Sequence, residues 1–90
     1  MLRIIGRVDA AFTIAGRSGT VLMLRDDKTR GVKAGLPVTL RTPSRVLGAV
    51  IVGLEFARTS RLQSGERACL VVSGVSPEDV PDGTTVEADL

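Results

Sequence analysis

Apolar residues occur along this chain in short runs, and polar residues or glycines interrupt them every few positions. The runs are rich in Val, Ile and Leu, and the breaks are rich in Gly, Pro, Asp and Ser. Such runs are typical of a β-barrel or a β-sandwich, and no segment shows the spacing of a long amphipathic helix. The pattern predicts strands over residues 2–8, 12–14, 20–25, 36–40, 47–57, 67–73 and 84–88.

The longest predicted strand, residues 47–57, indicates where the core lies. Successive side chains along a strand point to opposite faces, so Val50, Val52 and Leu54 share one face. The other face holds Ile51 and Glu55. We expect the first of these faces to line the interior, and glycines within the strand predict the bends that a barrel corner requires. The predicted core consists of Phe12, Val38, Leu40, Val50, Val52, Leu54, Leu70 and Val72.

One helical turn is predicted between the last two strands. Ser76 can cap the N-terminus of a helix, Pro77 suits the first helical position, and Asp79 occupies the reciprocal capping position. We therefore expect a single turn from Pro77 to Val80. Together with the strands, this predicts an all-β fold, a closed barrel of six or seven strands. The length of 90 residues is that of one domain, so a single barrel domain is expected over residues 1–90.

The sequence offers no recognisable set of catalytic or metal-binding residues. It has no histidine, which excludes a Ser–His–Asp triad and a Cys–His nucleophile. Its one cysteine, Cys69, lies in an apolar run and is interpreted first as a small buried hydrophobe and second as a reactive thiol. The glycine-containing segment 16–20 lacks the lysine of a phosphate-binding loop. We therefore expect no enzymatic activity, no metal site and no cofactor, nucleotides included.

Charge is distributed unevenly along the chain. Residues 1–45 hold nine Lys or Arg and three Asp, a net charge of +6, whereas residues 46–90 hold three Arg and seven acids, a net charge of −4. Such asymmetry can create a basic face that attracts phosphate groups. The alternative is an ordinary solvated surface, because the two halves of a barrel sequence need not form separate faces.

Short motifs follow one another in a fixed order in the last third of the chain. They are residues 53–56 (Gly-Leu-Glu-Phe), 62–66 (Leu-Gln-Ser-Gly-Glu), 74–80 (Gly-Val-Ser-Pro-Glu-Asp-Val) and 82–83 (Asp-Gly). Their order and spacing resemble domain 2 of the translational GTPases, best known from elongation factor Tu. Looser similarity in the first half extends the resemblance over residues 12–88. The family domain is a small β-barrel that touches the aminoacylated end of tRNA or the ribosome, so the resemblance implies such a barrel, standing alone without a GTPase domain.

The resemblance also implies where a ligand binds. In elongation factor Tu the Glu of the first motif helps to form the pocket for the terminal adenosine of tRNA, and its counterpart here is Glu55. Arg67 stands where the family has an Asn near the aminoacyl group, and Ser73 stands where it has an Arg. Glu55 has a second interpretation, as a solvated residue on the outside of the barrel. The candidate residues for binding RNA or another partner are Arg7, Arg17, Arg41, Arg45, Glu55, Arg58 and Arg67.

Two kinds of binding module are consistent with these patterns. The first contacts tRNA, rRNA or the ribosome through a basic face, using Arg and Lys on phosphates because both Phe residues are expected in the core. The second is a protein-interaction adaptor or translation-factor mimic that binds no RNA, with an exposed apolar patch near residues 2–5. The N-terminus lacks the pattern of a cleaved signal and no apolar run approaches the roughly 20 residues of a membrane span. We therefore expect a cytoplasmic protein without a membrane partner.

Overall fold

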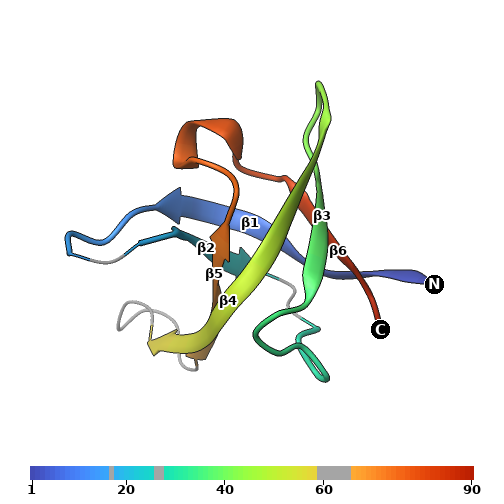
Figure 1. Cartoon of the computed structure of the whole chain (residues 1–90), viewed down its shortest axis with the longest axis horizontal. Helices are drawn as coiled ribbons and strands as arrows, with labels where there is room; N and C mark the ends of the chain where they lie inside the picture. The colour runs from blue at the N-terminus through green and yellow to red at the C-terminus, as the bar shows by residue number, and fades with distance from the viewer. Residues whose placement is uncertain (17, 26–27, 59–65) are drawn as a thin grey trace.

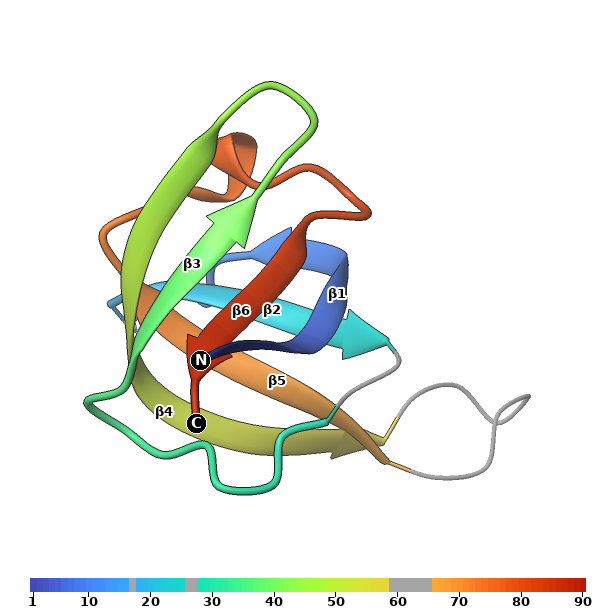
Figure 2. The ribbon, with the colours of Figure 1, turned by 90° about the vertical axis from the view of Figure 1, so that its right-hand side faces the viewer.

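In the part of the chain that the structure describes, six antiparallel strands close into a barrel (Figure 1). The computed structural model describes residues 1–16, 18–25, 28–58 and 66–90, with the backbone alone for residues 56–58, 66 and 67. The elements are β1 (Leu2–Phe12), β2 (Thr20–Arg25), β3 (Pro37–Arg41), β4 (Val46–Arg58), β5 (Glu66–Ser73), the 3-10 turn η1 (Pro77–Asp79) and β6 (Thr85–Asp89). Around the barrel the strands follow the order β1, β2, β5, β4, β3 and β6, which can be traced in Figure 2.

Strand β1 is long because it pairs with two neighbours. Its first part pairs with β6 and its second part with β2, and each ladder contains a bulge, between Ile4 and Gly6 and between Val8 and Ala10 respectively. A bulge adds one residue and bends the strand, which allows β1 to turn a corner of the barrel. The separate strand predicted for residues 12–14 is therefore wrong, because Phe12 ends β1 and the next two residues belong to no strand.

The predicted fold class is confirmed, with six strands and one helical turn in the described residues. The helical turn spans Pro77–Asp79, and the backbone N–H of Ser76 donates a hydrogen bond to Asp79 Oδ2 at 3.0 Å. This is the reciprocal contact that the sequence predicts. Val80, which follows the turn, is buried and packs into the core. The turn therefore positions the apolar side chain of Val80 against the barrel core.

The barrel interior is filled by aliphatic side chains from all six strands. Among the predicted core residues, Val38, Leu40, Leu70 and Val72 are buried there, and Leu54 is half-buried and packs against them. The prediction is wrong for Phe12, Val50 and Val52, whose exposed fractions are 37%, 40% and 51%. The largest fully buried aliphatic side chains are Ile5, Val8, Leu22, Leu24, Leu40, Ile51, Leu70, Val72 and Val86.

A bulge in β4 explains the error on that strand. Before it, Ile51 faces the core while its neighbours Val50 and Val52 face outward. The ladder between β4 and β5 shifts between Ile51 and Gly53, so Val52 is an extra residue. An extra residue reverses the alternation, and Leu54 then packs against the core. The predicted inner face of β4 is thus correct after the bulge and inverted before it.

Candidate functional site

Part of the outer face of four neighbouring strands is mainly apolar. Cross-strand pairing places Phe12 of β1 beside Val21 of β2, Val21 beside Val71 of β5, and Val71 beside Gly53 of β4. These residues alternate along their strands with core residues such as Leu22, so they face away from the interior. The next row holds Ala10, Met23, Cys69 and Glu55.

Two residues of this outer face are buried although they lie outside the barrel core. Val21 and Cys69 are 5% and 4% exposed, yet neither belongs to the cluster of side chains that fills the interior. Side chains on the outside of the sheet must therefore cover them. The expectation that Cys69 is a small buried hydrophobe is confirmed, and its place is beneath an external surface rather than in the barrel interior.

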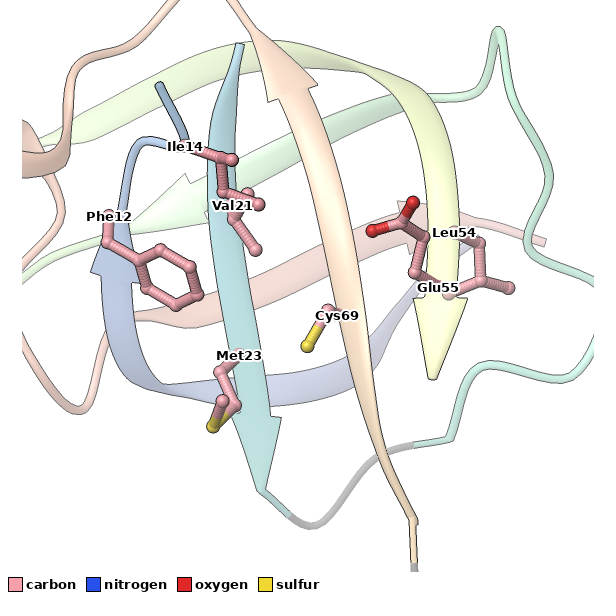
Figure 3. A pocket seen from close by; sticks show the side chains of 7 residues that line it. All are labelled: Phe12, Ile14, Val21, Met23, Leu54, Glu55 and Cys69. Carbon is pink, nitrogen blue, oxygen red and sulfur yellow. The ribbon is translucent and has the colours of Figure 1, made fainter. Parts of the chain in front are cut away.

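These rows border a groove with a volume of about 480 Å³. Figure 3 shows the Phe12 ring extending from β1 on one side and the Glu55 carboxylate extending from β4 on the other, with β2 and β5 between them. The volume lies within the range of roughly 300–1,000 Å³ that is usual for small-molecule sites. The described residues that line it are Phe12, Ile14, Val21, Met23, Leu54, Glu55 and Cys69, of which Glu55 alone is charged.

A second hollow of about 450 Å³ adjoins the first, and Glu55 lines both. Its wall includes Gly16 and Ser18, from the segment that joins β1 to β2. Gly19 allows that segment to lie against β5, because its φ is +96° and a Cβ at this position would lie 3.0 Å from Val71 Cγ1. Both the backbone angle and the contact favour glycine. The segment that joins β1 to β2 therefore lies close to β5 and forms part of the wall of the second hollow.

Glu55 is exposed between the two hollows, opposite Cys69 on β5. A carboxylate is a hydrogen-bond acceptor without a donor, so it selects ligands that present N–H or O–H groups. The surrounding apolar side chains favour ligands with a flat or apolar surface. The groove therefore suits a ligand with a planar apolar surface and a donor at one edge.

Two of the predicted binding arginines are engaged in ion pairs away from the groove. Arg41 Nε donates to both carboxylate oxygens of Glu87 at 2.9 Å, across β3 and β6. Arg45 Nη2 lies 2.9 Å from Asp79 Oδ1, which ties the β3–β4 turn to η1. That guanidinium lowers the pKa of Asp79, after the larger effect of the Ser76 N–H bond. These two arginines are paired with acidic side chains, and Arg17 lies outside the described residues, so the basic face stays a prediction.

The remaining predicted residues divide into two groups. Arg7 is exposed on β1, opposite Arg25 of β2 on one side and Thr85 of β6 on the other. Arg17 lies outside the described residues, and the side chains of Arg58 and Arg67 are likewise outside the description. Of the predicted set, the structure thus places Glu55 in the groove and Arg7 on the neighbouring surface.

The sequence interpretation missed Phe12, Met23 and Arg25 as surface residues of interest. A signal for Met23 is present in β2, where Val21 and Met23 alternate with Leu22 and Leu24. A strand that is apolar on both faces is covered on both. For Arg25 the sequence carries no comparable signal, because its position opposite Arg7 depends on the bulge in β1.

Within the described residues, no helix is long and apolar enough to cross a membrane. No group of three or more Cys, Asp or Glu side chains in that part of the chain is arranged to hold a metal ion. Comparison with protein-family models, with curated proteins and with solved structures gives no match.

Proposed function

We propose that this barrel is a non-catalytic RNA-binding module of the translation-factor type and that its groove accepts an unpaired base. The observation that carries the proposal is the presence of Phe12 and Glu55 on opposite sides of one hollow. Glu55 is the residue that the motif resemblance matches to the base-binding Glu of elongation factor Tu. The resemblance and the groove point to the same residue from independent starting points.

The exposed ring of Phe12 adds base stacking to the contacts by which the barrel could bind RNA. With both Phe residues in the core, binding would depend on phosphate contacts alone, but Phe12 is 37% exposed and lines the groove. Stacking of a base on an aromatic side chain contributes roughly 1–3 kcal/mol. An unpaired base can reach such a ring, whereas a base inside an A-form helix cannot. The groove therefore favours single-stranded ends and loops over duplex.

Glu55 supplies a preference among bases. Its carboxylate accepts hydrogen bonds from exocyclic amino groups, as acidic side chains do with cytosine. Adenine, cytosine and guanine carry such groups and uracil does not. We expect the groove to favour adenine, cytosine or guanine over uracil, and the ribose 2′-hydroxyl offers a further donor that DNA lacks.

Fluorescence anisotropy with three labelled RNA hairpins tests the proposal at low and at moderate salt. The hairpins share one stem and carry a 3′ overhang of adenosines and cytidines, an overhang of uridines, or a blunt end. We expect the first to bind most tightly and the blunt hairpin most weakly. Absence of binding to all three at low salt, or equal binding of the blunt hairpin, would contradict the proposal.

Two variants connect that binding to the groove. Glu55→Gln should weaken binding of the adenosine–cytidine overhang about tenfold, near the lower end of the roughly 1.5–3 kcal/mol for hydrogen bonds to charged groups. Phe12→Leu keeps an apolar side chain but removes the ring, and should weaken binding about fivefold, the low end of the stacking range of roughly 1–3 kcal/mol. Glu78→Gln, the same change at an exposed position on η1, is the matched control and should bind like the parent.

A protein partner on the first part of β1 is the second candidate function. Leu2 and Ile4 are 51% and 52% exposed, as the adaptor hypothesis expected for this segment. Exposed aliphatic side chains of this size favour contact with another apolar surface. Pull-down from lysate with and without nuclease, with Ile4→Asp as the comparison, tests this function. A partner retained after nuclease but lost in the variant would support it.

A further inference from the structure

Three arginines lie in one row across the outer face of β2, β1, β6 and β3. Arg25 is the cross-strand neighbour of Arg7, Arg7 is the neighbour of Thr85, and Thr85 is the neighbour of Arg41. We call Arg25, Arg7, Thr85 and Arg41 the arginine row. Directly opposed residues on antiparallel strands have Cβ atoms roughly 4.5–5.5 Å apart. The side chains of Arg7 and Arg25, which carry the same charge, therefore leave the backbone at adjacent positions.

The arginines of the row differ in how their charges are compensated. Glu87 holds Arg41 with two contacts of 2.9 Å. Arg25 Nη1 lies 3.4 Å from Asp9 Oδ1, at the bulge of β1. No acid in the described part of the chain lies within ion-pair distance of Arg7. Like charges directly opposite one another destabilise a strand pair, and an anion between them would remove that repulsion.

The row lies directly beside the groove. Arg25 is two residues after Met23 on β2, so the two side chains share the outer face and their Cα atoms are roughly 7 Å apart along the strand. Met23 lines the groove, and its cross-strand partner on β1 is Ala10. No charged side chain of β2 separates the groove from Arg25. A ligand that fills the groove and extends past Met23 therefore meets the Arg7–Arg25 pair next.

We propose that Arg7 and Arg25 bind a backbone phosphate of the same RNA strand whose base occupies the groove. This inference rests on the proposed function and adds the path of the strand, from the groove across β1 toward β6. Guanidinium groups suit this role because their fork of N–H donors matches two phosphate oxygens. Arg41 lies farther along the row, but its guanidinium is occupied by Glu87.

The test measures the salt dependence of RNA binding. The probe is a labelled single-stranded RNA hexamer of adenosines and cytidines, and the proteins are the full chain, Arg7→Gln, Arg25→Gln and Lys33→Gln. The last removes the same charge from the exposed loop before β3 and is the matched control. Losing one phosphate contact on a single strand should make the slope of log affinity against log salt shallower by roughly 0.7. We expect that change for Arg7→Gln and Arg25→Gln, with affinity at low salt about fivefold to tenfold lower, and no change of slope for Lys33→Gln.

A hexamer with uncharged methylphosphonate linkages separates phosphate contacts from base contacts. Arg7→Gln should bind it like the parent, whereas Glu55→Gln should bind it more weakly. Arg7→Lys should keep the salt slope but lose part of the affinity, because it keeps the charge without the fork. Inorganic pyrophosphate serves as a free anion and should displace the charged hexamer only at far higher concentrations than the hexamer itself requires.

The outcomes distinguish this inference from the function on which it rests. If Glu55→Gln weakens binding but Arg7→Gln and Arg25→Gln keep the parent slope, the groove binds RNA and the phosphate path is wrong. If the parent binds neither hexamer, the proposed function and the path both fail. If pyrophosphate binds more tightly than the charged hexamer, the arginine row is a site for a free anion, and its assignment to an RNA strand is overturned.

Discussion

The side chains on the outer surface differ between two sides of this barrel. On β3 and β6 the outer side chains include Arg41 and Glu87, which bind each other, and the Arg45–Asp79 pair secures the adjoining turn. We call this side the ion-paired face. On β2 and β5 the outer side chains that border the groove are apolar, and Val21 and Cys69 are buried there without belonging to the interior.

The difference shows where a ligand is to be expected. Charges that bind one another on a surface are largely satisfied, and an incoming ligand must displace those contacts. An apolar surface around an acceptor offers contact area that water compensates poorly. The groove therefore offers an incoming ligand apolar contact area, although it carries less charge than the ion-paired face.

The largest expected effect is on stability, and it tests which side chains of β4 face the core and which face outward. Ile51 and Val52 are adjacent on β4, but Ile51 is fully buried and Val52 is 51% exposed. Ile51→Ala should lower the free energy of unfolding by about 2–5 kcal/mol, and Val52→Ala should lower it by less than about 0.5 kcal/mol. Urea denaturation measures both. Equal losses would show that the bulge is misplaced.

The next effect compares the two faces with one kind of substitution. Val21→Thr places a hydroxyl in the covered layer outside β2 and should cost about 1–3 kcal/mol, the usual penalty for a poorly solvated neutral polar group. Val46→Thr places a hydroxyl at a position that is 57% exposed and directly opposite Arg41, where thermal unfolding should change little. If both variants melt alike, the outer layer over β2 is open to water and the groove has no apolar floor.

A smaller effect is expected from the ion-paired face. Glu87→Gln removes the negative charge and one of the two acceptor oxygens that bind Arg41, whose side chain is 51% exposed, and should cost about 0.5–1 kcal/mol at low salt. High salt should reduce the difference from the parent, because the pair is partly exposed and therefore screened. Urea denaturation at two salt concentrations measures this. RNA binding that fell as much as in Glu55→Gln would show that the two faces act together.

The smallest expected effect is on how stability depends on pH at acidic values. The pKa of Asp79 is lowered from its ordinary value of 3.8, first by the Ser76 N–H bond and then by Arg45. A lowered folded-state pKa contributes stability above the unfolded-state value, and this contribution is lost as pH falls through the folded-state pKa. The melting temperatures of the parent and Asp79→Asn should therefore differ near neutral pH. The difference should begin to shrink near pH 3.8 and disappear as pH falls through the lowered pKa of Asp79. The exposed Asp82→Asn serves as control, and a gap that persists at low pH would contradict this account.

The fold was predictable from local patterns because most of its strands have clear bounds. Thr20–Arg25 was predicted residue for residue, and the Ser76–Asp79 capping pattern predicted η1. The alternation in β3, with Val38 and Leu40 inside, also identified its buried face. In each of these segments the local residue pattern was sufficient to predict the element.

The groove was not predictable in the same way, since it depends on bulges and on pairing between distant strands. Residues 49–52 are apolar without interruption, so alternation alone cannot identify the inner face of β4. Phe12 was assigned to the interior because a large aromatic is usually buried, whereas its pairing with Val21 places it on the outer layer. Glu55 was identified through the motif resemblance, which says nothing of its neighbours across the sheet.

The bulge at Val52 has a consequence for aligning this barrel with others. A barrel that lacked the extra residue could keep Ile51 and Leu54 inside and Glu55 outside on a regular strand. The two sequences would then differ by a one-residue gap in the middle of β4, where gaps are usually penalised because strands tolerate them poorly. An alignment without that gap would match either Ile51 or Leu54 to a residue on the wrong face. For protein engineering, the same position offers a place where the length of β4 can change by one residue while the groove residues keep their orientation.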